Sequence, residues 1–172
     1  MPAIRPADPE ELEQLVAVEA AADRLFATVG FDLYPGPGTI DGLRRARAVL
    51  VAGRPPVGFA AVDEVDGSAH LEQLAVHPDH GRRGIGRALL EAACHWASRA
   101  GYPTMTLVTF TDVAWNGPFY VRSGFVPLVE LGPGLAELRA LDRANGLEDL
   151  GCRQVMVRHL GPAGRRLQAS SG

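Results

Sequence analysis

A glycine-rich turn lies directly between an apolar strand and the strongest helix that the sequence predicts. The strand is expected over 69–77 and the helix over 84–100, and the turn reads His80-Gly81-Arg82-Arg83-Gly84-Ile85-Gly86-Arg87. Apolar residues recur in the helix at intervals of three and four, which places them on one face against a core. These are Ile85, Leu89, Ala92, Ala93, Trp96 and Ala100. Such a helix, joined to a strand, requires a layered fold with both kinds of element.

The order of the other elements decides the fold class. Three strands are expected in succession, over 48–52, 56–63 and 69–77, and the Asp66-Gly67 pair is typical of a tight hairpin turn. Regular alternation of strand and helix is therefore absent. We expect an α+β fold with a mixed, mostly antiparallel central sheet flanked by helices. The remaining strands are expected over 3–5, 104–110, 125–130 and 153–160, and the helices over 9–26, 40–47 and 118–123, with a partly helical excursion over 131–150.

Length and composition limit the classes of function. The 172 residues favour one domain, expected over 1–160 and followed by a flexible tail over 161–172. All 17 basic residues are arginine, so no lysine can form a Schiff base or bind phosphate in a Walker loop. The net charge of −3 gives no reason to expect nucleic acid as a partner. No signal peptide or membrane-spanning run is evident, so we expect a cytoplasmic bacterial protein in which Cys94 and Cys152 are reduced, buried thiols.

The glycine turn has the chemistry of a pyrophosphate site. The first N–H groups of a helix have no partner within the helix, and glycines allow a ligand to approach the backbone closely. Arg82, Arg83 and Arg87 add positive charge where phosphates would lie. A dinucleotide fingerprint would need a third glycine where the chain has Leu89. A glycine-rich turn without any ligand remains an open alternative.

Two blocks of sequence resemble the GNAT superfamily of N-acetyltransferases. The first comprises Leu74-Ala75-Val76-His77-Pro78, Arg82-Arg83-Gly84-Ile85-Gly86 and Ala88-Leu89-Leu90, and it resembles the acetyl-CoA-binding core of that family. The usual first position of the turn falls on Gly81, so that contact would be lost and Arg82 or Arg83 would substitute for it. The second block is similar to a sequence motif of arylalkylamine N-acetyltransferases. It reads Asn116-Gly117-Pro118-Phe119-Tyr120-Val121-Arg122-Ser123-Gly124-Phe125. The resemblance covers roughly 69–128.

The resemblance implies transfer of an acetyl group from acetyl-CoA, as cosubstrate, to a primary amine by direct attack in a ternary complex. The acceptor, a small-molecule amine or a peptide, is left open, as is a homodimer, and no metal is expected. The alternative is a non-catalytic acetyl-CoA-binding sensor or regulatory domain. The residues expected to bind the cofactor are Leu74, Ala75, Val76, Arg82, Arg83, Gly84, Ile85, Gly86, Arg87 and Asn116.

Three side chains are candidates for the chemistry of the transfer. Tyr120 is the expected general acid for the departing thiolate, and the alternative is a tyrosine of the core. Glu72 and His70 lie on one face of their strand by alternation, and either could deprotonate the amine. The alternative for this pair is a solvated face of the sheet. Asn116 could instead cap the helix that follows it.

Two further features of this region concern the strand and the acceptor. The apolar positions Leu71, Leu74 and Val76 depart from a period of two, which predicts a β-bulge that frees backbone groups for the cofactor. An apolar acceptor wall is expected from Phe26, Phe31 and Tyr34, with Asp32 and Glu19 attracting a cation, although core packing explains the aromatic residues equally well.

Overall fold

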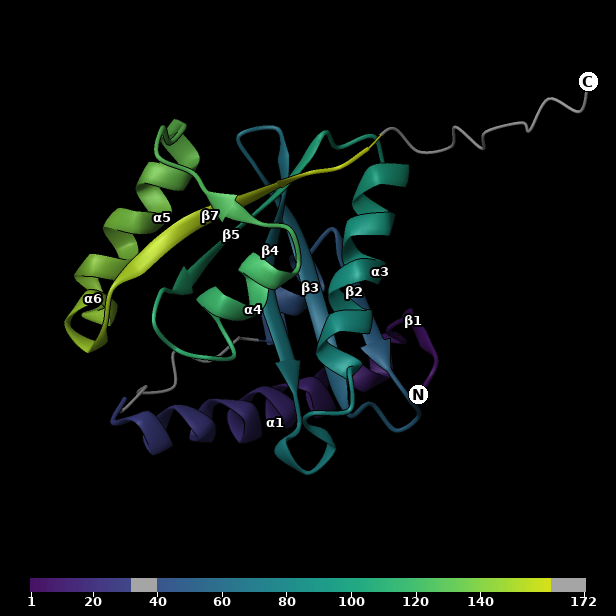
Figure 1. Ribbon diagram of the computed structural model, residues 1–172. Coiled ribbons are helices and arrows are strands. Elements are labelled where there is room, and N and C mark those ends of the chain that lie inside the picture. The colour runs from purple at the N-terminus through teal and green to yellow at the C-terminus, as the bar shows by residue number, and fades with distance from the viewer. Residues whose placement is uncertain (32–39, 162–172) are drawn as a thin grey trace, which may run out of the picture.

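The computed structural model describes residues 1–31 and 40–161, which form a seven-stranded sheet flanked by helices (Figure 1). The strands lie in the order β1-β2-β3-β4-β5-β7-β6. They are β1 (Ile4–Pro6), β2 (Ala48–Ala52), β3 (Gly58–Val65), β4 (Ser68–Val76), β5 (Thr104–Phe110), β6 (Val126–Pro127) and β7 (Arg153–His159). The α-helices are α1 (Leu12–Asp23), α2 (Ile40–Arg45), α3 (Ile85–Arg99), α4 (Gly117–Arg122), α5 (Pro133–Ala144) and α6 (Leu147–Leu150).

The central strands β4 and β5 are parallel, whereas the other neighbouring strands are antiparallel. The chain leaves β4, runs through α3 and returns as β5, which is the kind of crossover that parallel strands need. The two strands pair only at Ala69 with Met105 and at His70 with Thr106. Beyond these pairs both strands continue without pairing to each other. The mixed, mostly antiparallel α+β sheet expected from the sequence is confirmed.

A β-bulge interrupts β4 just after these two pairs. Val62 of β3 pairs with Leu71, but the preceding residue, Ala61, pairs with Gln73. Glu72 therefore lies opposite no residue of β3, as the extra residue of a bulge does. The bulge predicted from the sequence is present, and its extra residue is a candidate catalytic carboxylate.

The bulge changes which residues of β4 face α3. Before it, Ala69 and Leu71 pack in the hydrophobic cluster that α3 covers. After it, Leu74 and Val76 pack against that cluster, while Ala75 packs on the side of α1. Because side chains alternate along a strand, this change of parity needs one additional residue.

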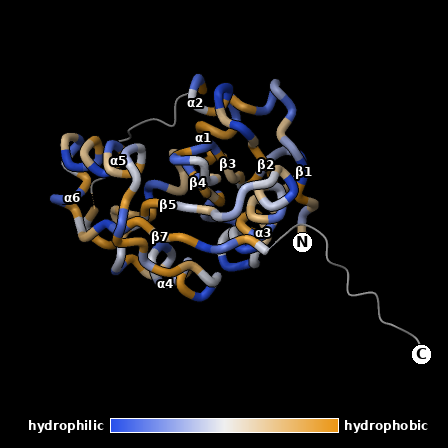
Figure 2. Tube along the Cα trace, turned by 90° about the horizontal axis from the view of Figure 1, so that it is seen from above, coloured by the Kyte–Doolittle hydropathy of each residue, from blue (hydrophilic) through white to orange (hydrophobic). Residues whose placement is uncertain are grey.

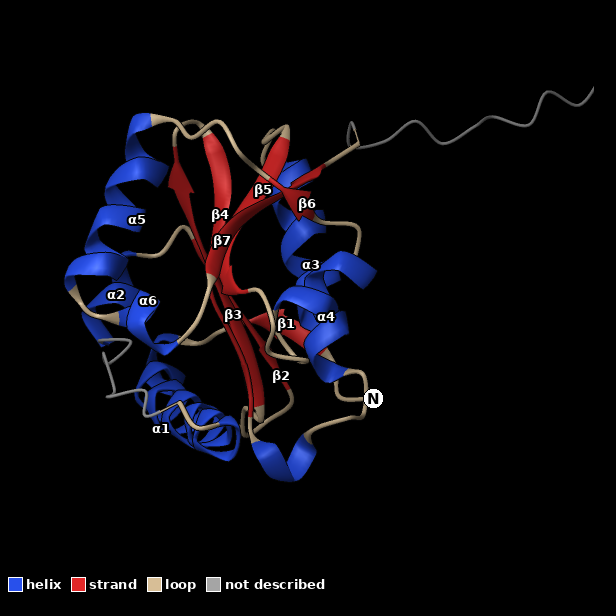
Figure 3. Cartoon of the chain, turned by 60° about the vertical axis from the view of Figure 1, so that its left-hand side comes forward, coloured by secondary structure: helices blue, strands red, loops and turns tan. Residues whose placement is uncertain are grey.

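The sheet separates two layers of helices (Figure 3). Helices α3 and α4 lie on one face, and α1, α2, α5 and α6 lie on the other. Hydrophobic and hydrophilic residues alternate along α5 and α6 (Figure 2), as expected of helices that bury one side only. No helix among residues 1–31 and 40–161 is long and apolar enough to cross a membrane.

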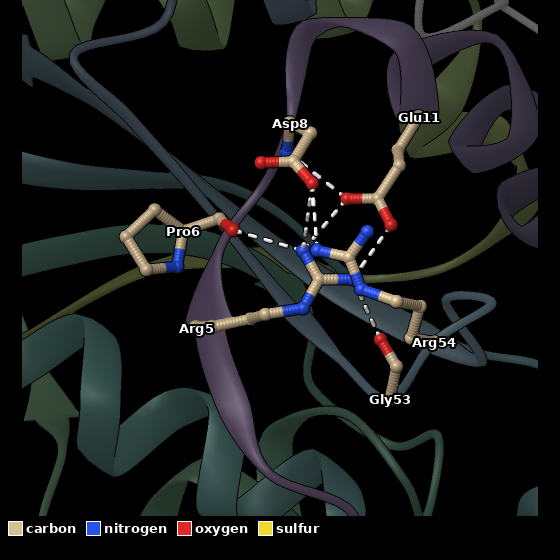
Figure 4. Close-up of polar contacts among 6 residues, drawn as sticks. All are labelled: Arg5, Pro6, Asp8, Glu11, Gly53 and Arg54. Carbon is tan, nitrogen blue, oxygen red and sulfur yellow. Dashed lines mark hydrogen bonds and ion pairs between the residues drawn. The ribbon is translucent and has the colours of Figure 1, made fainter.

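The edge strand β1 is held to the sheet and to the first helical turn by ion pairs (Figure 4). Both terminal nitrogens of Arg5 donate to the Glu11 carboxylate, at 2.7 and 2.6 Å, and Nη2 also donates to the carbonyl of Gly53. Hydrogen bonds from Arg5 and from the backbone N–H of Asp8 lower the pKa of Glu11 to about 2. Arg54 donates to the Asp8 carboxylate at 2.7 Å. The short strand is thus tied to both neighbouring segments.

Helix α5 takes its N-terminal cap from the distant β3–β4 hairpin. The Asp66 carboxylate accepts hydrogen bonds from the backbone N–H groups of Gly134 (2.8 Å) and Leu135 (3.0 Å). A Cβ atom on Gly132 or Gly134 would lie within 3 Å of the Asp66 side chain. Glycine at both positions therefore allows the carboxylate to reach the free N–H groups. This contact places α5 over the strand that carries the bulge.

Several details of the sequence-based expectation are wrong. Strand β6 has two residues rather than six, because the chain leaves the sheet edge and Val129 is 88% exposed. Cys94 is buried as expected, but Cys152, which was also expected to be buried, is exposed just before β7. The expected tail at 162–172, together with Asp32 and Tyr34, lies outside the described residues.

Replacing Asp66 should test the cap on α5. Asp66 has φ of 52°, in the left-handed region, so Asp66→Gly is tolerated by the backbone and removes only the carboxylate. We expect a loss of about 1 kcal/mol of unfolding free energy, the usual worth of a helix cap, measured by urea denaturation. Asp66→Asn keeps an acceptor oxygen and should lose less. Equal stability of Asp66→Gly and the unaltered chain would contradict the role of this carboxylate.

Gly117, the first residue of α4, should tolerate no side chain. A Cβ atom there would clash with the carbonyl oxygen of Thr111 and would lie 2.9 Å from that of Phe110. We expect Gly117→Ala to destabilise the chain by about 1–3 kcal/mol, because backbone must move to make room. Gly161→Ala is the matched control, since no atom lies within 4 Å of its Cβ. Similar melting temperatures for the two variants would refute the close packing of α4.

Candidate functional site

A small cavity opens where β4 and β5 separate. Its volume is about 80 Å³. It is bounded by the two strands, by one side of α5 and by the first residue of β7. The lining residues are His70, Leu71, Glu72, Val108, Leu138, Asp142 and Arg153. The two candidate bases of the sequence analysis therefore lie in one cavity, on the α5 face of the sheet.

His70 is held in a defined orientation at the bottom of this site. Its side chain is buried, with 3% exposed, and its Nδ1 lies 2.9 Å from Thr106 Oγ1. The Thr106 hydroxyl donates to the carbonyl of Ala69, so it accepts from His70 and leaves Nε2 with the lone pair. Burial lowers the pKa of His70 to about 4. The imidazole is therefore neutral at pH 7 and is a weak base.

Glu72, the bulged residue, has the opposite electrostatic character. Its side chain is 59% exposed, and one carboxylate oxygen lies 3.8 Å from His70 Nε2. Desolvation raises the pKa of Glu72 above its usual value, and the nearby carboxylates of Asp63 and Asp142 raise it further. A carboxylate whose pKa moves toward neutrality becomes a better proton acceptor. The local field thus favours Glu72 over His70 as a base.

The far wall of the cavity carries a network of charges that the sequence analysis did not identify. The Asp142 carboxylate accepts hydrogen bonds from Arg139 Nη1 and from Arg153 Nε, each at 2.9 Å. Arg139 also donates to Glu148 on α6 and to the backbone carbonyl of Arg153. The guanidinium carbon of Arg153 lies 4.6 Å from the centre of the Phe110 ring. Two positive and two negative side chains thus fix α5, α6 and β7 to one another.

No sequence pattern indicated that Arg139, Asp142 and Arg153 belong to the site. Asp142 and Arg139 belong to an excursion for which only partial helicity was expected, and Arg153 begins a strand 81 positions after Glu72 (153 − 72). Only the order of the strands brings α5 and β7 beside β4 and β5. A periodic pattern could not have placed these charges in the same cavity.

The glycine turn is exposed and has the backbone of a helix start. Gly84 is the N-cap residue of α3 with φ of 78°, a conformation that favours glycine, and Arg82 has φ of 58°. Arg82, Arg83 and Arg87 are exposed. In the described part of the chain none of the three lies within 4.0 Å of a carboxylate. The turn therefore offers free backbone donors and uncompensated positive charge.

Apart from Asn116, the other residues predicted to bind cofactor lie in the first turn of α3 and at the end of β4. Ile85, Gly86 and Arg87 form the first turn of α3, while Leu74, Ala75 and Val76 are the last residues of β4, beyond the bulge. Here β4 has β3 on one side and no strand partner on the other. This edge is open to an extended ligand.

Tyr120 lies on α4, across the sheet from the cavity. Its ring contacts Phe119 and Phe125, with centroids 5.1 and 5.7 Å away, and packs against the cluster beneath α3. Burial raises the pKa of the phenol. Asn116 precedes α4, but its side chain makes no capping bond; it accepts a hydrogen bond from Thr109 Oγ1 at 3.0 Å. Asn116 is therefore the N-cap residue of α4 by position, but its side chain does not cap the helix.

The expected apolar wall is present in part as a cluster of four aromatic rings. Phe26 contacts Phe31, Phe110 and Trp115, with centroid distances of 6.3, 5.8 and 5.6 Å. Phe110 also lies under the Arg153 guanidinium, so the cluster adjoins the cavity. Glu19 is buried on α1 and is not an exposed cation site.

Comparison with known proteins identifies the fold and the family of the central segment. Residues 45–127 match the family model for the acetyltransferase (GNAT) domain. The tRNA(Met) cytidine acetyltransferase TmcA of Salmonella typhimurium is 34% identical over 97 residues, which cover 53% of this chain but only 13% of that protein. The ribosomal-protein-S18-alanine N-acetyltransferase of Escherichia coli superposes with a TM-score of 0.66 at 20% identity, over 97% of this chain and 99% of that one.

A complex with coenzyme A is among the similar structures. The PaiA N-acetyltransferase of Thermoplasma acidophilum, solved with coenzyme A, has a TM-score of 0.66 at 16% identity, over 92% of this chain and 99% of that one. These folds share the sheet and its helical layers over nearly the whole described chain. Residues 45–127, which include the central strands and the glycine turn, thus form a domain of the acetyltransferase (GNAT) type.

Proposed function

We propose that the chain is an N-acetyltransferase that moves the acetyl group of acetyl-CoA directly onto an amine. The observation that carries the proposal is the separation of β4 from β5, which connects two faces of the sheet with different chemistry. One face has the glycine turn, the three exposed arginines and Tyr120. The other has a cavity with two candidate bases. A thioester and an amine that enter from opposite faces would meet between the strands.

Acetyl-CoA would bind along the open edge of β4 and at the start of α3. The pyrophosphate fits the free N–H groups and positive end of the α3 dipole, with Arg82, Arg83 and Arg87 around it. The pantetheine arm would run beside Leu74, Ala75 and Val76, where the strand edge lacks a partner. Asn116 lies near the inner end of this path. The coenzyme A bound to PaiA, a protein of the same fold, is consistent with this use of the fold.

Glu72 is the base that the electrostatics favour for the amine. An ammonium group that enters the cavity would find a carboxylate whose raised pKa makes it a stronger proton acceptor. His70, whose pKa is about 4, would position the acceptor through Nε2 instead of removing a proton. The neutral amine then attacks the thioester carbonyl, and the C–S bond breaks to release the thiolate of CoA.

Tyr120 would donate a proton to that thiolate. The raised pKa keeps the phenol protonated at neutral pH, which a donor requires. Burial disfavours the phenolate that this transfer leaves, so Tyr120 would recover a proton from the attacking nitrogen, which must lose one to become the amide. A non-catalytic acetyl-CoA sensor would bind the cofactor equally well but would not need a base in the facing cavity. Turnover with a panel of amines separates the two functions.

Removing the Tyr120 hydroxyl should affect chemistry more than binding. Tyr120→Phe keeps the ring contacts with Phe119 and Phe125, and we expect kcat and kcat/KM to fall together by roughly 10²–10⁴-fold. Acetyl-CoA affinity, measured by calorimetry, should change little. Tyr102→Phe is the matched control, since its hydroxyl bonds to exposed Glu64. A folded Tyr120→Phe protein with normal kcat and rate-limiting chemistry would exclude Tyr120 as the acid.

The pH profile should distinguish the two candidate bases. We expect Glu72→Gln to lower kcat/KM by roughly 10²-fold or more at pH 7, with recovery at higher pH because the free amine becomes more abundant. His70→Gln should lower activity without this recovery, because it removes a positioning contact. Glu137→Gln, at an exposed position of α5, is the control for loss of a carboxylate. Loss of equal size at every pH in Glu72→Gln would exclude it as the base.

A further inference from the structure

The Arg153 side chain has donors that no residue of the described chain uses. Its Nε bonds to Asp142, and one face of the guanidinium lies on Phe110. The terminal nitrogens Nη1 and Nη2 have no acceptor among residues 1–31 and 40–161, although the side chain is only 14% exposed. Neither of these nitrogens is itself buried, so both can reach a partner from solvent. The two nitrogens are thus available to an anion at the cavity.

The surroundings hold this guanidinium in one orientation. The Asp142 oxygen that accepts from Arg153 Nε also accepts a hydrogen bond from Arg139 Nη1, so it cannot follow a movement of Arg153 freely. The Phe110 ring restricts rotation of the guanidinium plane. A planar fork that is fixed in advance matches the two oxygens of a carboxylate and loses little side-chain entropy on binding it.

The opposite wall of the same cavity has the opposite charge. Glu72 and Arg153 both line it, yet no atoms of their charged groups approach within 4.0 Å. The cavity volume of about 80 Å³ is far below the roughly 300–1,000 Å³ of pockets that enclose whole ligands. Only a small part of an acceptor enters, so the groups that meet Glu72 and Arg153 must lie a few bonds apart.

We propose that the acceptor is a small zwitterion, in which a primary amine and a carboxylate are separated by a few bonds, and that Arg153 binds the carboxylate while the amine faces Glu72. This inference rests on the proposed acetyl transfer and specifies its substrate class. Free amino acids and similar short amino-carboxylic acids fit the description. The N-terminal residue of a peptide lacks the adjacent carboxylate and fits it poorly.

The test compares each L-amino acid with its own carboxamide as acceptor, using the full chain and acetyl-CoA, with products detected by mass spectrometry. Amines without a carboxylate and peptides with free N-termini complete the panel. We expect the best acceptor to carry a free carboxylate, and its carboxamide to show a KM about 10- to 100-fold higher, the usual worth of a charge-assisted pair. The kcat values should differ less.

Variants of Arg153 test whether this side chain causes the preference for acid over carboxamide. Arg153→Gln should remove the preference for acid over amide while acetyl-CoA affinity is unchanged. Arg153→Lys keeps the charge beside Asp142 but lacks the paired donors, and should retain only part of the preference. Arg143→Gln is the matched control, because Arg143 is 56% exposed and contacts only the outer part of the network, 3.9 Å from Glu148.

Each outcome has a distinct meaning. Preferred transfer to amines without a carboxylate, or to peptide N-termini, would overturn the zwitterion but leave the acetyltransferase intact. A preference for the acid that survives in both Arg153→Gln and Arg153→Lys would overturn the role of Arg153. If the folded chain binds acetyl-CoA and acetylates none of the amines, the proposed enzymatic function fails, and the inference about its acceptor fails with it.

Discussion

The separation of β4 from β5 after two residue pairs is the constraint on which the site depends. A continuous sheet would close the space between the strands where the cavity lies. The bulge at Glu72 lies at the point of separation, so one irregularity changes the parity of β4 and places a carboxylate beside the opening. Both faces of the sheet nevertheless stay packed, because the apolar residues of β4 after the bulge turn toward the core again.

The two faces meet different physical demands. On the α3 face a ligand with phosphates needs exposed donors and positive charge, and local sequence supplies both within a single turn. On the α5 face the groups are gathered from β4, β5, α5 and β7, and their charges balance within the protein. Asp66 contributes to this second arrangement from the β3–β4 hairpin, because its carboxylate caps α5 and keeps the helix above the bulge.

Burial gives His70 and Glu72 different properties although they lie 3.8 Å apart. The desolvated imidazole of His70 loses its proton, whereas the carboxylate of Glu72 gains affinity for one. Desolvation always disfavours the charged form, so it moves the two pKa values in opposite directions. The two neighbouring side chains therefore differ in their affinity for a proton, with His70 buried and Glu72 59% exposed.

The sequence by itself determined the α+β class, most element positions, the glycine turn and the bulge. These features depend on hydrophobic periodicity, on turn residues and on the alternation of side chains along a strand, all of which are properties of a few neighbouring residues. It also indicated Glu72, His70 and Tyr120 as candidates, because they belong to recognisable local blocks. Only the tertiary structure decided how the excursion over 131–150 is used and that Arg153 and Asp142 share a cavity with Glu72. Those relations join residues far apart in the chain, and they depend on strand order and helix placement, which no local pattern encodes.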